Sequence, residues 1–264
     1  GASFARQRAI VEAQGTWIGF LDDDNVPANN WVCSAHRFGL SHPQAAAFGS
    51  QIHARYEVSP PQGFERIAAF FPIVEREEVI CFTTGWRAMS NLVPPGAGLV
   101  IRKSAWQQHV PQELVLKGPV GSALSEKGED VESLLHLKKA GWEIWFNPDM
   151  HIEHRIPRRR FERQYLLDFF WGIGLSKYTT RMVPYQRWQR PFMVGLYLLN
   201  DTQKIIRHVI RHRQNVRRDL VAACEFQLLL SSLWGPFYRW QQRLFSTPYV
   251  AGSGQSPCPT ESVP

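Results

Sequence analysis

With 264 residues, of which 44% are hydrophobic and 12% aromatic, the chain is long enough to bury a large core, and it is too rich in aromatic residues for an intrinsically disordered protein. The formal net charge is +7, and no apolar run approaches the roughly 18–20 residues of a membrane span, the nearest being Leu220 to Trp234. The four cysteines have no CxxC spacing, which excludes a zinc or disulfide framework and indicates reduced cysteines in a cytosolic protein.

The first part of the chain predicts an alternation of helices and short strands. Residues 4–14 have a helical pattern that stops at Gly15, and an apolar run over 17–21 then ends abruptly at three aspartates. A helix over about 30–40 and a strand over 46–56 come next. This order of helix, buried strand, acidic loop, helix and strand is typical of an α/β domain, which is the fold class we expect.

The middle of the chain continues this pattern, and the last third departs from it. The predicted elements are a loop (94–98), a strand (99–101), a brief helix (104–108), a longer helix (126–140), a strand (142–146), a turn (147–149) and a last strand (150–154). After Pro157 the chain is rich in Arg and aromatic residues, with helical patterns to about Phe245. Residues 246–264 are rich in Ser, Pro and Gly without periodicity, which predicts a disordered tail.

The three aspartates at the end of the first strand are the strongest local signal. Asp22, Asp23 and Asp24 repel one another, and a divalent cation such as Mg²⁺ or Mn²⁺ is the usual compensation because it prefers carboxylate oxygens. In open α/β sheets, ligands bind beyond the carboxyl ends of the strands, where this loop is expected. The alternative is a solvated turn that caps the next helix. The strand before the loop and the helix after Pro27 favour the metal site.

The residues around this triplet resemble the family 2 glycosyltransferases. The resemblance rests on the runs Arg6 to Ile10 (RQRAI) and Ala13 to Asp24 (AQGTWIGFLDDD), followed by Pro27 and Trp31. In that family a helix with an ARN-like start leads into a strand that ends in a DxD motif, and here Gln7 stands in place of the usual Asn. The resemblance implies a GT-A type α/β fold, with Asp22 and Asp24 as the DxD pair on Mn²⁺ or Mg²⁺. It also implies that Arg6, Asp22 and Asp23 contact the nucleotide sugar.

A second acidic motif, Gly128-Glu129-Asp130, precedes a helical pattern that ends at Gly141. Acids in a first helical turn are often only favourable partners of the helix dipole. The flanking residues nevertheless resemble the second motif of the same family, whose Asp is the general base. The resemblance implies that Asp130 takes the proton from an acceptor hydroxyl, and that Glu129 assists catalysis by binding the acceptor or orienting the site.

Three further positions follow from the resemblance. Related enzymes often carry a third metal ligand, a His, after a short strand in this region, and His154 matches it with His151 as the competitor. Gly96 and Gly98 precede a strand in a segment that resembles the lining of the sugar pocket, where glycine allows close backbone approach. Arg102, after that strand, is expected to bind the acceptor.

The resemblance divides the chain into three parts. Residues 1–157 are expected to form the catalytic domain, without the first β-α-β unit that holds the nucleotide base in complete family members, because nothing precedes Gly1 to supply it. Residues 158–245 form a basic helical appendage, and 246–264 the tail. The stretch from Arg155 to Asp219 holds fifteen Arg or Lys against four acids. We expect the appendage, residues 158–245, to contact an anionic membrane surface. An ordinary helical subdomain with a solvated basic face is the alternative, and we expect no nucleic-acid partner because no such motif is present.

The function expected from these residues is metal-dependent, inverting transfer of a sugar. The donor would be a nucleoside-diphosphate sugar (UDP- or GDP-sugar), and the acceptor the hydroxyl of a saccharide or a lipid-linked molecule, in the synthesis of surface or extracellular polysaccharide. We expect a cytoplasmic location, peripheral on the inner face of the plasma membrane. The alternatives are a non-catalytic protein that binds a membrane or a partner with the same fold, and a metal-dependent phosphohydrolase.

Overall fold

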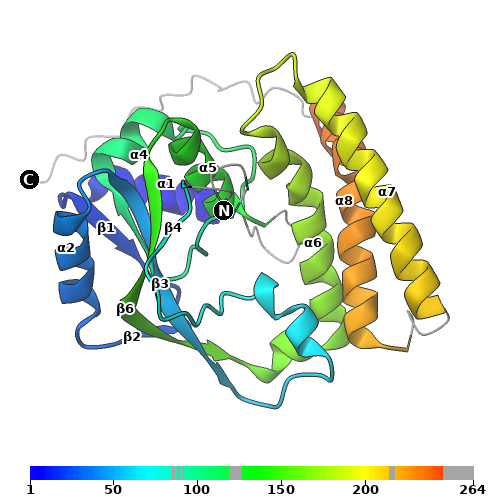
Figure 1. Ribbon diagram of the computed structural model, residues 1–264, viewed down its shortest axis with the longest axis horizontal. Helices are drawn as coiled ribbons and strands as arrows, with labels where there is room; N and C mark the ends of the chain where they lie inside the picture. The colour runs from blue at the N-terminus through cyan, green and yellow to red at the C-terminus, as the bar shows by residue number, and fades with distance from the viewer. Residues whose placement is uncertain (85–86, 88–89, 91, 119–126, 214–217, 246–264) are drawn as a thin grey trace, which may run out of the picture.

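The computed structural model describes residues 1–84, 87, 90, 92–118, 127–213 and 218–245 (Figure 1). The predicted disordered tail, 246–264, lies outside the described residues. The fold is mixed α/β, as expected, with a six-stranded sheet and long helices beside it. In chain order, the elements of the sheet region are α1 (Ala2–Glu12), β1 (Trp17–Phe20), β2 (Asn25–Pro27), α2 (Trp31–Ser41), β3 (Ala45–Tyr56), β4 (Ile80–Cys81), β5 (Leu99–Arg102), α4 (Lys103–His109), α5 (Glu129–Lys139) and β6 (Glu143–Ile156).

The sheet order is β1-β5-β3-β6-β2, with β4 also paired to β6. β3 and β6 are the long central strands and run parallel, whereas the other pairings are antiparallel. The predicted turn at 147–149 is wrong, because β6 continues through it. Both halves of β6 pair with β3, and the register shifts from Ser50↔Asn147 to Gln51↔His151, so the intervening residues form a bulge. Such a bulge tolerates Pro148, which has no N–H to give to the ladder.

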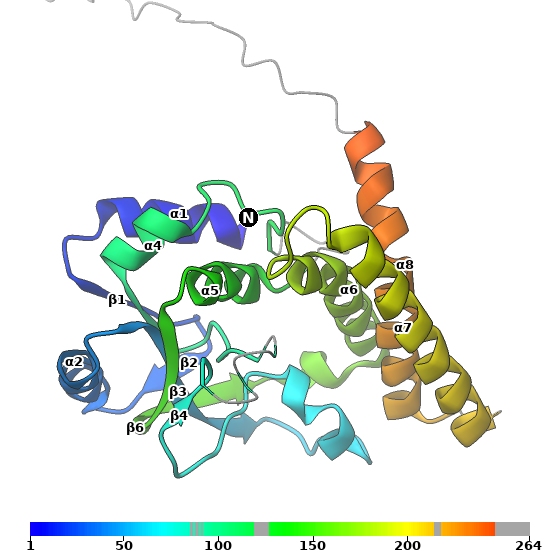
Figure 2. The ribbon, with the colours of Figure 1, turned by 45° about the horizontal axis from the view of Figure 1, so that its top comes forward.

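Helices cover both faces of the sheet (Figure 2). On one face, α1, α4 and α5 bury Ile10, Trp106 and Leu134 against β5 and β6. On the other face, α2 buries Trp31 and Phe38 against side chains of the central strands. Full burial of such side chains stabilises the fold by about 1.5–3 kcal/mol each. This packing fixes the ends of β1 and β6, which carry the candidate site.

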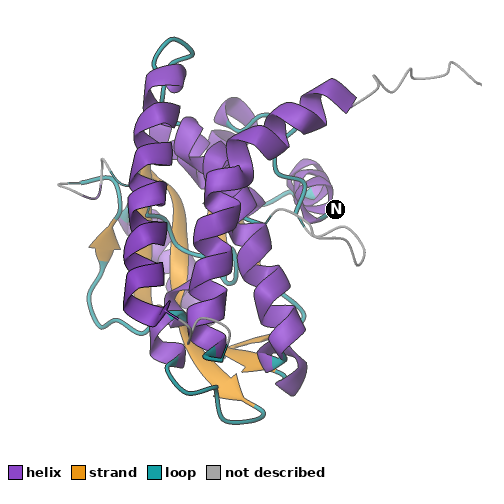
Figure 3. Ribbon diagram, turned by 90° about the vertical axis from the view of Figure 1, so that its right-hand side faces the viewer, coloured by secondary structure: helices purple, strands orange, loops and turns teal. Residues whose placement is uncertain are grey.

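Three long helices form the rest of the described structure (Figure 3). They are α6 (Arg163–Met182), α7 (Arg190–His212) and α8 (Leu220–Phe245), and short 3-10 helices at Phe64–Arg66, Ala68–Phe70 and Arg158–Phe161 connect to them. α6 and α8 share a hydrophobic cluster with the sheet region that includes Ile67, Ile156, Phe170 and Cys224. The basic helical region is therefore packed directly against the segment that follows β3.

One helix in the described part of the chain is long and apolar enough to cross a membrane. It is the stretch Leu220–Gln242 of α8, of which 44% is buried inside the structure. The expectation that no segment approaches the length of a span is therefore too strict. A core helix passes the same test, and the burial of α8 against α6 gives its apolar composition an ordinary reason.

Candidate functional site

The acidic loop leaves the sheet at the end of β1 and returns to it as β2. β2 pairs antiparallel with β6 in a register that places Asn25 opposite His154, and Arg155 N–H donates to the Asp24 carbonyl at 2.9 Å. Asn25 is buried, and its side chain ties the loop by donating to Asp24 Oδ1 at 3.0 Å and accepting from Asp22 N–H at 3.2 Å. This short strand, which the sequence pattern did not predict, brings the aspartates to the predicted histidine.

His154 is buried beside Asp24 in a defined tautomer. Its Nδ1 lies 3.3 Å from the Pro72 carbonyl, which can only accept, so Nδ1 carries the proton. Its Nε2 then has the lone pair, and it lies 3.6 Å from Asp24 Oδ2 and 3.2 Å from the Arg160 guanidinium. Burial lowers the pKa of His154 despite the opposing charge of Asp24, so the ring is neutral at pH 7. A neutral imidazole whose other nitrogen donates to a carbonyl is the form that ligates metals.

Asp22 and Asp24 carry negative charge that the protein only partly compensates. Asp24 Oδ2 accepts from Arg160 at 2.5 Å. Burial raises the pKa of Asp22, and the negative charges of Asp24 and Asp130 raise it further. The positive charge of Arg6 acts in the opposite direction. A raised carboxylate pKa among like charges marks a place where a bound cation would be stabilising.

The start of α5 brings the second acidic motif to the same region. Asp130 Oδ2 accepts from Gly96 N–H at 2.7 Å and Oδ1 from Val131 N–H at 2.8 Å, so two backbone donors fix the carboxylate. Each oxygen keeps a further lone pair for a proton. A Cβ added at Gly96 would lie 2.7 Å from Asp130 Oδ2, so this approach requires glycine. Gly96 thus positions the candidate base.

Glu129 is buried at the start of α5. It forms an ion pair with Arg6 at 3.4 Å. Burial and the neighbouring charge of Asp130 raise the pKa of Glu129, and Arg6 opposes this. Gly118, with φ of 70°, packs so closely that an added Cβ would lie 2.9 Å from Glu129 Cδ. Arg6 and Glu129 therefore lie beside the site and join α1 to α5, and direct acceptor contact by Glu129 does not agree with this burial.

Two predicted residues, Arg102 and Gly98, are not brought to the cluster in the expected way. Arg102 lies where β5 pairs with the start of β1, at the opposite end of that strand from the acidic loop, and its guanidinium donates to the carbonyls of Ala45 and Pro43 at 2.9 Å each. Gly98 is buried, with φ of 64°, and an added Cβ would meet the side chain of Ile152, so sheet packing accounts for this glycine. Asp23 is exposed in the loop.

The histidine that competes with His154 is placed differently. His151 is exposed, stacks on His53 and shares a hydrogen bond with it at 3.0 Å. Of the two, only His154 has a nitrogen facing an aspartate of the triplet. The structure therefore favours His154 over His151 as a partner of Asp24.

Two basic residues near the acidic loop, Arg160 and Lys127, were not expected there from the sequence pattern. Arg160 was assigned to the basic appendage, yet it contacts both Asp24 and His154. Lys127 lies near Arg160 and Glu129 and over the ring of Phe169, and burial together with the charge of Arg160 lowers its pKa. The run Arg158-Arg159-Arg160 directly after the strand of His154 was the available signal, because a cation there could serve an anionic ligand.

The donor atoms suit a divalent cation. Carboxylate oxygens from Asp22 and Asp24 and a neutral imidazole nitrogen from His154 form an O, O, N set that suits Mn²⁺ and is acceptable to Mg²⁺. Arg160 now contributes the positive charge there, so a cation at Asp24 requires its guanidinium to move. Arg160 could then contact phosphate oxygens of a ligand on that cation, because guanidinium groups bind phosphate well.

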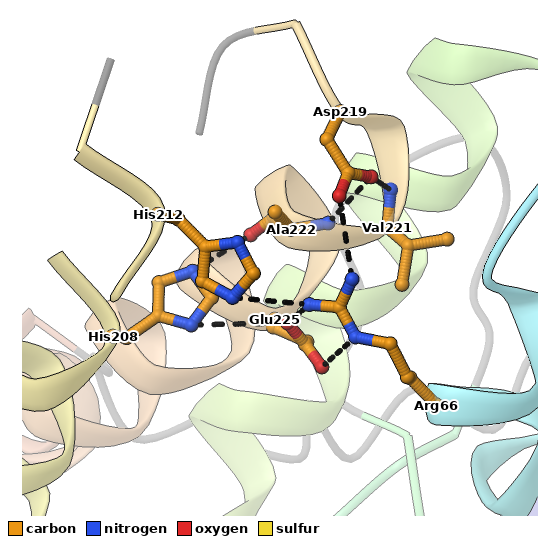
Figure 4. A network of polar contacts seen from close by, with 7 residues as sticks. All are labelled: Arg66, His208, His212, Asp219, Val221, Ala222 and Glu225. Atoms are coloured by element: carbon orange, nitrogen blue, oxygen red, sulfur yellow. Dashed lines mark hydrogen bonds and ion pairs between the residues drawn. The ribbon is translucent and has the colours of Figure 1, made fainter. Parts of the chain in front are cut away.

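A second group of possible metal ligands lies between α7 and α8 (Figure 4). The donor atoms of His208, His212 and Glu225 lie within 4.8 Å of one another. Arg66 contacts Glu225, Asp219 and His212 Nε2, the last at 3.3 Å. Its guanidinium already neutralises both carboxylates, so this group acts as an ion-pair network that joins the segment after β3 to the long helices.

Comparison with known protein families found no matching family, and comparison with curated proteins found no similar sequence.

Proposed function

We propose that the cluster is the catalytic centre of a metal-dependent, inverting glycosyltransferase with a GT-A type fold, which transfers a sugar from a nucleoside diphosphate to a hydroxyl group. The observation that carries the proposal is the convergence of two acidic motifs about a hundred residues apart. Asp24 lies 3.6 Å from His154 Nε2, and Asp24, His154 and Asp130 are all close enough for their charges to shift the pKa of Asp22. The aspartates of the first motif could hold a cation, and Asp130 of the second motif could act as the general base.

The residues support a single displacement at the anomeric carbon. Asp130 accepts the proton of the acceptor hydroxyl while that oxygen bonds to the anomeric carbon, and the bond from this carbon to the diphosphate oxygen breaks on the opposite side. The N–H groups of Gly96 and Val131 hold the Asp130 carboxylate in place during this step. A divalent cation at Asp22, Asp24 and His154 would stabilise the charge that develops on the leaving diphosphate. Arg160 and Lys127 add positive charge on the same side.

Turnover with the Asp130→Asn variant tests the role of the base. We expect release of nucleoside diphosphate from UDP- or GDP-sugars, in the presence of Mn²⁺ and a saccharide acceptor, to fall by about 10²–10⁴-fold, with donor affinity nearly unchanged. Asp149→Asn changes an exposed aspartate of β6 and should keep the wild-type rate. Absence of transfer by the wild-type chain favours a binding protein, and phosphate-ester hydrolysis without an acceptor favours a phosphohydrolase. Either result overturns the proposal.

A further inference from the structure

Helix α7 is attached to the protein through a mixed inner side, in which Val194, Tyr197 and Leu198 meet residues of α6 and α8 beside the buried Asp201. Asp201 is only 2% exposed. It forms a bidentate ion pair with Arg181 of α6, at 2.5 and 3.0 Å, and accepts a hydrogen bond from the Ser232 hydroxyl of α8 at 2.7 Å. His208 forms a hydrogen bond with the Ala222 carbonyl at 3.0 Å. The inward side of α7 therefore already holds apolar residues, and packing within the protein does not account for a further apolar row on the opposite side of the helix.

A second set of apolar side chains on α7 faces away from the protein. They are spaced by three, four or seven residues, which places them on one side of a helix with 3.6 residues per turn, roughly half a turn from Asp201. Phe192 is 70% exposed and Ile210 is 65% exposed, at the two ends of the row. We call this row the outer face of α7; it consists of Phe192, Leu196, Leu199, Ile206 and Ile210.

The exposed charges of α7 are all positive. Lys204, Arg207 and Arg211 are exposed and lie along one border of the outer face by the same helical spacing, whereas the acid of this helix, Asp201, is buried. A row of apolar side chains bordered by cations is complementary to a lipid surface with anionic headgroups.

The neighbouring helix adds aromatic side chains of the same kind. Trp234, Phe237 and Trp240 of α8 are half or more exposed, and the last turns of α8 project beyond the other helices (Figure 2). Trp188, just before α7, is also exposed. Tryptophan prefers the depth of lipid headgroups, where its ring is buried and its N–H stays hydrated.

We propose that the outer face of α7 lies on an anionic lipid surface, with the apolar row in the headgroup region and Lys204, Arg207 and Arg211 on the lipid phosphates. The helix lies parallel to the surface and does not cross it. This surface is separate from the Asp22–His154 cluster, so the inference holds or fails independently of the sugar transfer.

Vesicle co-sedimentation of the full chain tests the proposal. The vesicles are phosphatidylcholine alone and equal parts of phosphatidylcholine and phosphatidylglycerol, at 0.1 M and 1 M salt, where the Debye length falls from about 10 Å to about 3 Å. The paired changes Leu199→Gln and Ile210→Gln remove part of the apolar row. Val32→Gln and Leu40→Gln, on α2 at the other side of the molecule (Figure 1), are a matched control because those residues are 71% and 69% exposed.

We expect binding to the anionic vesicles to exceed binding to the neutral ones by ten- to a hundredfold at 0.1 M salt, and to weaken at 1 M. The Leu199→Gln and Ile210→Gln pair should lose at least tenfold in binding at both salt concentrations, and the α2 control should match the wild type. Replacing Lys204, Arg207 and Arg211 by Gln should remove only the salt-sensitive part. Equal binding to both vesicle types, or an unchanged outer-face variant, overturns the proposal. So does a dimer in sedimentation velocity that the Leu199→Gln and Ile210→Gln pair converts to a monomer, because the face then pairs two copies.

Discussion

In the candidate site, the Arg160 guanidinium lies against both Asp24 and His154. It donates to Asp24 Oδ2 and contacts His154 Nε2, so a cation bound by these two atoms would replace the guanidinium. The arrangement resolves the repulsion between the carboxylates in the absence of a ligand. Binding of a cation together with a diphosphate would give Arg160 a new anionic partner, so the same side chain can serve both states.

A single glycine controls the position of the candidate base. Gly96→Ala places a Cβ 2.7 Å from Asp130 Oδ2, which forces the carboxylate to shift. We expect turnover to fall by roughly 10²-fold, the order of loss that a displacement of about 1 Å causes. Steady-state kinetics with saturating donor measures this effect.

Gly195→Ala is the matched control for that change. Nothing lies within 4 Å of a Cβ at Gly195, which is exposed in α7. The control should keep the wild-type rate and gain about 0.5–1 kcal/mol of stability, because alanine is the better helix former. A Gly96→Ala variant with normal turnover would show that the contact from Gly96 does not position the base.

At the scale of the elements, Asp201 joins α7 to both α6 and α8. Burial by itself would raise the pKa of Asp201, but the hydrogen bonds from Arg181 and Ser232 outweigh it and lower the pKa. We expect Asp201→Asn to reduce the free energy of unfolding by on the order of 3 kcal/mol, because it leaves the Arg181 charge uncompensated. Urea denaturation of Asp201→Asn measures this loss. Asp168→Asn changes an exposed aspartate of α6 and should alter stability by no more than about 0.5 kcal/mol.

The lowered pKa of Asp201 also gives a pH dependence. Its stabilising contribution is fully present above the ordinary Asp value of about 3.9 and is lost as the pH falls further, through the lower pKa of the folded state. The wild-type chain should therefore lose more stability below about pH 4 than Asp201→Asn does. Parallel acid-denaturation curves for the two proteins would contradict this account of the contact.

Two elements show where local sequence patterns are sufficient and where they are not. The strand at 17–20 and the helix at 129–139 follow from apolar patterns and glycine stops, and both agree with the predictions within a few residues. β2 has only three residues and no apolar pattern, so it forms because β6 offers an open edge. The continuity of β6 through Pro148 likewise depends on the pairing of both its halves with β3.

At the scale of the whole molecule, the same distinction applies to the site. The acidic motifs could be predicted because carboxylates beside a strand end and a helix start are local features. The position of Arg160 could not, because it depends on how the chain after β6 turns back over the acidic loop, and the same turn brings Arg160 close to Lys127. Arg102 was expected near the acidic loop, but it pairs with the start of β1 while the loop follows the end of that strand. The sequence does not show which end of β1 lies beside Arg102, because that depends on how the strands pair.

The molecule presents two chemically different regions. The sheet and its helices hold the acidic cluster, and the long helices carry the basic and apolar outer face of α7 (Figures 1 and 3). The hydrophobic cluster around Ile67, Phe170 and Cys224 and the Arg66 network connect them. An enzyme that acts on a lipid-linked acceptor would benefit from such a connection, because it fixes the site relative to the surface that carries the acceptor.

Calorimetric titration of UDP and GDP into the chain, with and without Mn²⁺, tests the central claim most directly. The account predicts that one of these nucleotides binds only when Mn²⁺ is present, that Asp24→Asn weakens this binding by at least tenfold, and that Asp149→Asn leaves it unchanged. Matching circular dichroism spectra would show that all three proteins are folded. Nucleotide binding that does not depend on Mn²⁺, or that survives in Asp24→Asn, would contradict the assignment of Asp22, Asp24 and His154 as a metal site.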